Sequence, residues 1–268
     1  MFTLTCGGGW VPGSFAEKIA AAAALGYRSV EPLCWLGEDL RAARDAFDRT
    51  RCGISAILIQ SADAETQRLI SNDHGIVHED ARDAFVRAVG ETLAAAQLLG
   101  TRNIVVTSGN ERTEMPVVPR AVQHTNIVAA LRAALPVIEG SGVTLVLEPL
   151  NALVNHQGYF LTTAAEGAGI IREVNSPQVK MLFDVYHQQI TEGNLIHNIR
   201  AYRNEIGHFH VGDVPGRNEP GTGEINYRNV FRAIAATGYD GFVVFECGLT
   251  EAVETVTEKM FRLAEGLA

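Results

Sequence analysis

The stretch Val143-Thr-Leu-Val-Leu-Glu148 is a short apolar run that ends in an acidic residue. Its length and its β-branched residues predict a buried strand. Three later runs repeat this design, and each closes on a residue that can bind a metal: Val179-Lys-Met-Leu-Phe-Asp184, Ile206-Gly-His-Phe-His210 and Phe242-Val-Val-Phe-Glu246. Segments with helical periodicity lie between these runs, so strands and helices alternate through this half of the chain.

The first half of the chain shows the same alternation. We expect its strands at 2–5, 29–31, 54–60 and 103–107, and its helices at 15–25, 39–50, 79–99 and 118–139. In the second half we expect helices at 163–174, 195–203, 227–237 and 251–267. Alternating strands and helices imply an α/β fold with a parallel sheet. Eight such units in 268 residues favour a single (β/α)₈ barrel domain spanning residues 1–268. An open, doubly wound sheet is the alternative.

The composition excludes several classes of function. The formal net charge is −9, and no cluster of lysine and arginine residues offers a basic stripe. Binding to nucleic acid or to anionic membranes is therefore not expected. No run reaches membrane-spanning length, and the N-terminus lacks the pattern of a signal peptide. The four cysteines have no CxxC spacing, so we expect reduced thiols in a cytoplasmic protein.

The strand ends carry the candidate metal site. In barrels of this kind the active site lies at the C-terminal ends of the strands, and neighbouring strands are about 5 Å apart. Glu148, Asp184, His210 and Glu246 can therefore converge on one divalent ion. Three carboxylates and one imidazole suit Mn²⁺, Mg²⁺ or Co²⁺. The alternative for each residue alone is a helix cap or an ion pair.

Residues near these strand ends are candidates for substrate binding. His187 follows Asp184 by three residues, and His208 shares a strand face with His210. The alternative for His208 is a packed core histidine, or contact with a carboxylate behind the ligands. Arg217 lies in a loop rich in glycine and proline, where an ion pair with Glu219 or Glu224 is the alternative. Further candidates lie at the expected barrel mouth: Cys6, Cys247, His156, Trp10 and Trp35.

The run Cys6-Gly-Gly-Gly9 is not a dinucleotide-binding fingerprint, because it lacks the GxGxxG spacing. We expect it to permit a tight turn or a close approach of the backbone to a ligand.

Several motifs resemble one known family. They are Leu147-Glu-Pro-Leu-Asn151, Phe183-Asp-Val-Tyr-His187, Gly207-His-Phe-His-Val-Gly-Asp213 and Pro215-Gly-Arg-Asn-Glu-Pro-Gly-Thr-Gly-Glu-Ile-Asn-Tyr227. Together they resemble hydroxypyruvate isomerase, which belongs to the xylose-isomerase-like TIM barrel superfamily with the ketose 3-epimerases and endonuclease IV. The resemblance is dense between Val143 and Glu246 and diffuse before it.

The resemblance implies a metal-dependent isomerase of a small sugar or hydroxy-oxo acid. Glu148, Asp184, His210 and Glu246 would be the metal ligands, with Glu148 and Glu246 also acting as the acid–base pair. His187 and Arg217 would hold the oxygens of the substrate. The ion would chelate a carbonyl and its neighbouring hydroxyl and so stabilise an enediolate. Relatives are often dimers or tetramers, so a homo-oligomer is expected.

Departures from the family's pattern surround the pocket and leave the ligands intact. The chain has Cys-Gly-Leu after Glu246, Ala-Leu-Val-Asn after Asn151 and Cys-Gly-Gly-Gly-Trp in its first strand. Because of these departures, the expected substrate is one of three: hydroxypyruvate, a 2-oxo-tetronate, or a ketose epimerised at C3. A dehydratase and a non-catalytic sugar-binding barrel are further alternatives. Phosphodiester hydrolysis is disfavoured, because it would need a richer cluster of zinc ligands and a basic surface.

Overall fold

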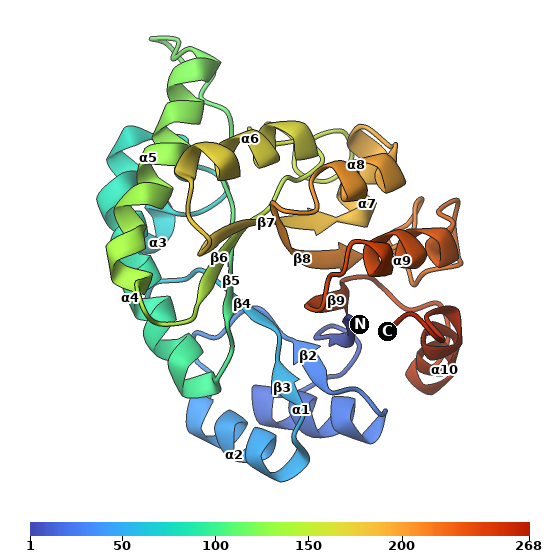
Figure 1. Ribbon diagram of the computed structural model, residues 1–268. Coiled ribbons are helices and arrows are strands. Elements are labelled where there is room, and N and C mark those ends of the chain that lie inside the picture. Colours follow the sequence, from blue (N-terminus) through green and yellow to red (C-terminus); the bar gives the residue numbers. More distant parts are fainter.

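The computed structural model describes residues 1–268, and its strands form one parallel sheet that curves into a barrel (Figure 1). The strands are β1 (Thr3–Gly7), β2 (Ser29–Glu31), β3 (Gly53–Ile54), β4 (Ala56–Leu58), β5 (Asn103–Val106), β6 (Thr144–Leu147), β7 (Val179–Asp184), β8 (Ile206–Val211) and β9 (Phe242–Phe245). Their spatial order is β3-β2-β1-β9-β8-β7-β6-β5-β4. Amides of Ser55 and Leu58 donate to carbonyls on the β2 side of the ring, which closes the gap between β4 and β2. The predicted barrel is therefore confirmed.

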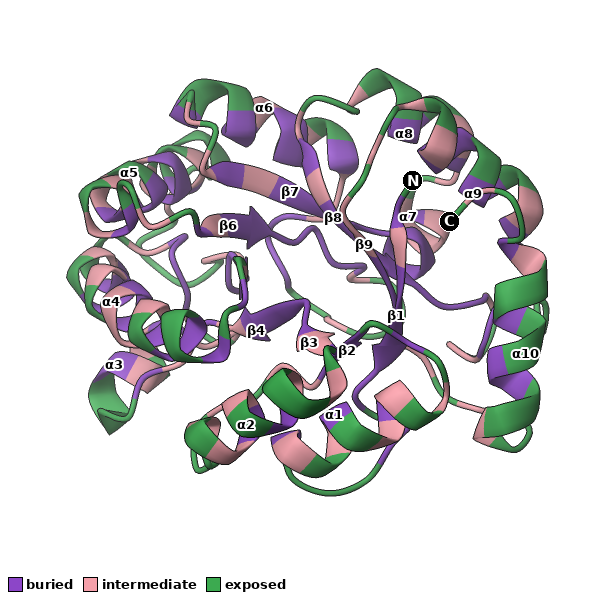
Figure 2. Ribbon diagram, turned by 60° about the horizontal axis from the view of Figure 1, so that its bottom comes forward, coloured by how far each residue is buried: buried purple, intermediate pink, exposed green.

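Helices surround the barrel and turn their buried faces toward it (Figure 2). They are α1 (Phe15–Ala24), α2 (Leu40–Thr50), α3 (Ala64–Leu69), η1 (Glu79–Ala81), α4 (Arg82–Leu99), α5 (Arg120–Ile138), α6 (Ala164–Val174), α7 (Val185–Thr191), α8 (Leu195–Ala201), α9 (Tyr227–Ala236) and α10 (Val253–Leu263). The two termini lie close together in both views. None of the helices combines the length and the apolar character needed to cross a membrane.

The structure differs from the prediction in the third strand and in two short helices. The expected strand 54–60 is divided at Ser55, because the residues before it pair with β2 and the residues after it pair with β5. The hydroxyl of Ser55 donates to the carboxylate of Glu31 inside the barrel. The short helix α3 was not predicted. The other unpredicted helix, α7, begins at Asp184, whose side chain caps it by accepting from the amides of Tyr186 and His187. Asp184 thus carries a helix-capping signal as well as a metal-binding one.

The apolar core has two parts, separated by the wall of the barrel. The larger cluster contains 65 buried residues and fills the space between the strands and the helices. The smaller cluster contains Ala56, Val105, Val146 and Leu182. Val146 and Leu182 lie two residues before Glu148 and Asp184 and so share the inward face of their strands. This small cluster therefore forms an apolar floor beneath the polar residues at the strand ends.

The glycines after Cys6 allow the end of β1 to pack closely against its two neighbouring strands. A Cβ atom at Gly7 would lie 2.0 Å from the carbonyl oxygen of Phe245 on β9. At Gly8, a Cβ atom would lie 2.5 Å from the carbonyl oxygen of Glu31 on β2. The run therefore permits a close approach to the backbone of β9 and β2, where the amide of Gly8 also donates to the carbonyl of Glu31. The expected approach to a ligand stays a prediction.

We expect Gly8→Ala to lower the free energy of unfolding by about 1–3 kcal/mol, because the added methyl group overpacks a fixed backbone contact. Gly9→Ala is the matched control, since a Cβ atom there meets nothing within 4 Å. Urea unfolding of both variants measures the effect. Equal stability of the two variants would show that the β1–β2 contact adapts to the extra carbon.

Candidate active site

The structure brings the four strand-end residues together at one end of the barrel. Asp184 ends β7, His210 lies in β8, and Glu148 and Glu246 directly follow β6 and β9. One donor atom from each residue lies within 4.8 Å of the others. Glu148, Asp184 and His210 are buried, whereas the side chain of Glu246 is 32% exposed. The cluster is therefore open to solvent on the Glu246 side.

Two atoms of this cluster are buried without any hydrogen-bond partner. They are Oε1 of Glu148 and Nδ1 of His210, which lie 3.6 Å apart. His210 Nδ1 is also 3.2 Å from Oε2 of Glu246. Buried polar atoms are normally paired, so two unpaired atoms beside one point are suited to coordinating a ligand there. Three carboxylates and one imidazole fit Mn²⁺, Mg²⁺ or Co²⁺ at this point, and the residues present thus satisfy the requirements of such a site.

The carboxylates and the imidazole shift one another's pKa values. Burial, with Glu246 and Asp184 nearby, raises the pKa of Glu148 to about 7 against the opposing effect of His210. Burial also acts on Glu246, but His210 and Arg217 outweigh it and lower its pKa to about 2. Burial lowers the pKa of His210, yet the surrounding carboxylates raise it well above its ordinary value. The cluster therefore stabilises positive charge at its centre.

Asp184 uses its two oxygens for different purposes. Its Oδ1 accepts the amides that cap α7, at 2.8 Å from Tyr186 N and 3.4 Å from His187 N. Its Oδ2 faces the site and lies 3.4 Å from Arg217 Nη2. Both interpretations of this residue, a helix cap and a ligand, are therefore compatible with one side chain.

Arg217 reaches the cluster from the loop between β8 and α9. Its guanidinium pairs with Glu246 and Asp184 and stands over the ring of Tyr186, 5.0 Å from the centroid. The predicted alternatives, ion pairs with Glu219 or Glu224, do not form. Glu219 instead accepts from Thr250, and Glu224 accepts from Gln189.

The loop that carries Arg217 is held by a buried carboxylate. Asp213 accepts hydrogen bonds from the amides of Val214, Gly221 and Ile225 at 2.8 to 3.1 Å. A Cβ atom at Gly223 would lie 2.1 Å from the carbonyl oxygen of Val214. The Pro-Gly-Thr-Gly part of the motif therefore allows the chain to turn back tightly on itself. This turn shapes the loop that carries Arg217.

His187 supplies an unpaired hydrogen-bond donor next to the cluster. Its Nδ1 accepts from Asn151 Nδ2 at 2.6 Å, because the amide oxygen of Asn151 is used by Val154 and Asn155. Burial lowers the pKa of His187 to about 4, so the ring is neutral at pH 7. A neutral ring that accepts at Nδ1 carries its proton on Nε2. This buried Nε2 has no hydrogen-bond partner, although Asp184 Oδ2 lies 3.4 Å away, and it is available to a ligand oxygen.

Three other candidates, Cys6, Trp10 and Trp35, do not join the cluster. Cys6 follows Thr5, whose hydroxyl bonds Ser29 inside the barrel, so the Cys6 side chain faces outward into the larger core cluster. Burial raises the pKa of its thiol to about 12. Trp10 and Trp35 donate their indole N–H groups to the carbonyls of Cys247 and Leu58. These residues therefore have structural partners.

A cavity of about 320 Å³ lies at the side of the cluster and is lined by Gly7–Gly9, Arg217, Glu246 and Cys247. Arg217 is its only lysine, arginine or histidine. His156 lies at the outer edge of the site, with its ring 5.3 Å from that of His187. The cavity is of a size for a small molecule rather than a polymer.

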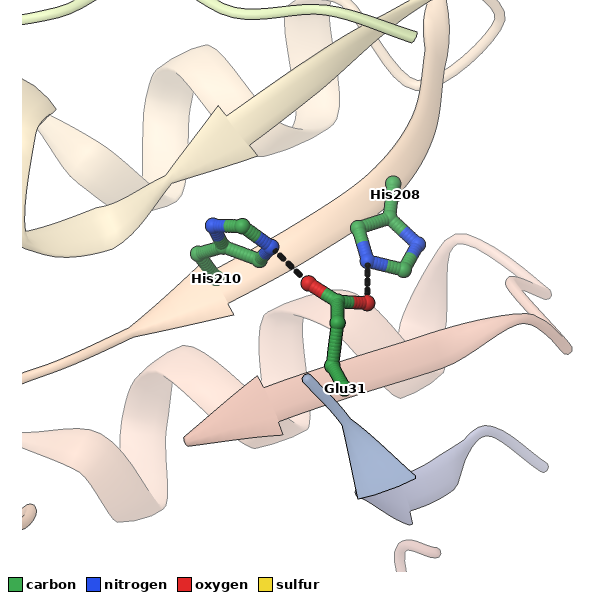
Figure 3. A group of neighbouring side chains, drawn as sticks. All are labelled: Glu31, His208 and His210. Atoms are coloured by element: carbon green, nitrogen blue, oxygen red, sulfur yellow. Dashed lines mark hydrogen bonds and ion pairs between the residues drawn. The ribbon is translucent and has the colours of Figure 1, made fainter. Parts of the chain in front are cut away.

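Glu31 is the residue that sequence reasoning missed. It ends β2, is buried, and accepts from Nε2 of both His208 (2.8 Å) and His210 (2.5 Å), as Figure 3 shows. His208 therefore contacts a carboxylate behind the ligands, which was one of its predicted alternatives. Burial raises the pKa of Glu31, but the two histidines outweigh it and hold it well below its usual range. The signal was available, because Glu31 closes a short strand as Glu148 closes another.

Comparison with known proteins agrees with this architecture. The family model described as "Xylose isomerase-like TIM barrel" matches residues 19–263. A "Putative hydroxypyruvate isomerase" from Danio rerio is 30% identical over 94% of this chain and 92% of its own length. A "2-oxo-tetronate isomerase" from Cupriavidus necator is 32% identical, with coverages of 86% and 85%. The resemblance inferred from the motifs is confirmed.

Solved structures support the fold over nearly the whole chain. The structure described as "AP endonuclease, family 2 from Brucella melitensis" superposes with a TM-score of 0.86 and 24% identity, covering 98% of each chain. Structures of ketose 3-epimerases also match, at 24% identity or less. At these identities the likeness shows the shared barrel alone.

Proposed function

Because the chain belongs to the xylose isomerase-like TIM barrel family, we propose that it is a divalent-metal-dependent isomerase of a small hydroxy-carbonyl compound, similar to hydroxypyruvate isomerase. The observation that carries this proposal is the convergence of Glu148 and Glu246 on one centre, where Glu148 Oε1 and His210 Nδ1 are buried and unpaired. Isomerisation of this kind moves a proton between neighbouring carbons, and two carboxylates at one site supply its acceptor and donor.

A bound divalent ion would supply positive charge beside the substrate's oxygens, which lowers the free energy of an enediolate. Glu148, Asp184, His210 and Glu246 would hold it. One carboxylate takes the proton from the carbon next to the carbonyl, and it or its partner returns a proton to the neighbouring carbon. The hydroxyl proton moves between the two substrate oxygens, so the reaction needs no oxidant. His187 Nε2–H and the Arg217 guanidinium donate to substrate oxygens and fix their position.

A second candidate is a ketose 3-epimerase, and the environment of Arg217 favours it. This arginine is the cavity's only cationic side chain and is already paired with Glu246 and Asp184. A substrate carboxylate would have to compete with both, whereas the hydroxyls of an uncharged ketose would not. The cytoplasmic location and the homo-oligomer, dimer or tetramer, remain predictions from the sequence.

Hydrogen exchange tests both candidates. We expect the Mn²⁺-loaded protein in D₂O to incorporate deuterium at a carbon next to the carbonyl of hydroxypyruvate, of a 2-oxo-tetronate or of a ketose, as followed by NMR. The position of the label and the product separate an isomerase from an epimerase. Glu224→Gln, a loop carboxylate outside the cluster, is the matched control and should exchange like the wild type. Absence of exchange with every substrate would eliminate the proton-transfer proposal.

A further inference from the structure

Glu31 connects two strands of the barrel that are not neighbours. It lies on β2, while His208 and His210 lie on β8, and β1 and β9 separate these two strands in the ring. Its carboxylate spans the interior and accepts one Nε2–H from each histidine (Figure 3). Ser55, which lies between β3 and β4, donates its hydroxyl to Oε2 of Glu31 at 2.5 Å. His208 donates to the same oxygen. Donors from two other parts of the barrel, β8 and the residue between β3 and β4, therefore converge on this side chain.

We propose that Glu31 is a positioning residue for His210, which fixes the imidazole so that Nδ1 points at the metal centre. This inference rests on the metal site of the proposed function. A carboxylate accepts hydrogen bonds and donates none, so Nε2 of His210 must carry a proton where it meets Glu31. The other nitrogen, Nδ1, then faces Glu148 and Glu246, at 3.6 and 3.2 Å. The bond to Glu31 thus selects both the orientation of the ring and the nitrogen that binds.

His208 and Ser55 fix Glu31 in turn. His208 Nδ1 faces Asn103 Nδ2 at 3.4 Å, which leaves its Nε2–H for Glu31. With Ser55 also donating, both carboxylate oxygens accept hydrogen bonds, and any rotation of the side chain would break at least one of them. All of these groups are buried apart from Asn103, which is partly buried. The cost of burying the carboxylate is offset only if every donor stays in place.

The variant Glu31→Gln tests the role of the carboxylate. A glutamine amide can accept from one histidine, but its NH₂ group then meets the N–H of the other. We expect Mn²⁺ affinity, measured by calorimetry and by electron paramagnetic resonance, to fall about 10–100-fold, as for other residues that orient metal-binding histidines. The visible spectrum of the Co²⁺-loaded protein should change as well, because the ligand geometry changes. Circular dichroism checks that the variant is folded.

The matched control is the double variant Thr5→Val/Ser29→Ala. It removes another buried hydrogen bond between β1 and β2 inside the barrel, at 2.6 Å, without touching Glu31. Removing both partners leaves no unpaired group, so Mn²⁺ affinity should be unchanged. Ser55→Ala keeps the carboxylate but removes one donor, and it should weaken Mn²⁺ binding less than Glu31→Gln does. It also tests the proposal if Glu31→Gln does not fold.

The outcomes separate this inference from the proposed function. A wild type that binds no Mn²⁺ would overturn both. A wild type that binds Mn²⁺, with Glu31→Gln and Ser55→Ala binding equally well and the Co²⁺ spectrum unchanged, would overturn only the role of Glu31. An equal loss of affinity in the Thr5→Val/Ser29→Ala control would also overturn it, because the effect would then come from general disturbance of the barrel.

Discussion

Replacing Glu246 with glutamine is expected to lower kcat by about 10²–10⁴-fold, the contribution of a positioned acid–base group, while the protein stays folded. Glutamine has the same shape but cannot accept the substrate's proton. Glu246 is the most exposed member of the cluster and borders the cavity, so it is placed to reach a bound substrate. Its low pKa keeps it ionised near neutral pH, ready to accept a proton.

Steady-state kinetics with the most active substrate measure this effect, with urea unfolding as the check on folding. Loss of the ion pair to Arg217 should change stability little, because both side chains are partly exposed. Glu224→Gln again serves as the control, since it lies in the Arg217 loop outside the cluster. Near-normal turnover by Glu246→Gln would show that Glu246 is not needed for proton transfer.

Removal of divalent metal is expected to abolish activity and to destabilise the protein. Three carboxylates crowd one buried centre, and a cation there relieves their repulsion. A ligand that binds only the folded state stabilises it by about 2.7 kcal/mol at 100 times its Kd. Thermal unfolding and activity after chelation, and again after adding Mn²⁺, measure both effects. His210→Gln should lose the stabilisation by Mn²⁺.

Another group of side chains that could hold a metal ion, nearer the surface, provides the control for this experiment. His74, His78 and Asp80 also lie within 4.8 Å of one another, but two of them are partly buried and Asp80 is exposed. The double variant His74→Gln/His78→Gln should keep the full response to Mn²⁺. Activity that survives complete chelation would contradict the metal-dependent proposal, and loss of the response in this double variant would place the ion elsewhere.

Most of the fold could be predicted from local patterns. The eight strands and their helices follow from apolar periodicity, and their ends differ from prediction by a few residues. The break at Ser55 could not be predicted, because apolar periodicity does not show where the pairing of the strand changes from β2 to β5. The helix α7 was not predicted, although a helix cap was the alternative for Asp184, because a helix of seven residues shows little apolar periodicity.

The candidate site was predicted in part. The structure brings together Glu148, Asp184, His210 and Glu246 as their positions at strand ends required. The partners of Arg217 could not be predicted, because its loop carries three acidic residues nearer in sequence than Glu246 or Asp184. Cys6 illustrates a different difficulty. Near the end of a strand, a shift of one residue decides whether a side chain faces the barrel interior or the helix layer.

The sequence by itself determined the alternation of strands and helices and the identity of the residues that end the strands. These features depend on neighbours a few positions apart, which local patterns record. Only the tertiary structure decided that Glu31 meets His208 and His210, which are 177 and 179 positions away. It also decided which acidic groups have raised or lowered pKa values. Both depend on distances and on burial, and these exist only once the ring of strands has closed.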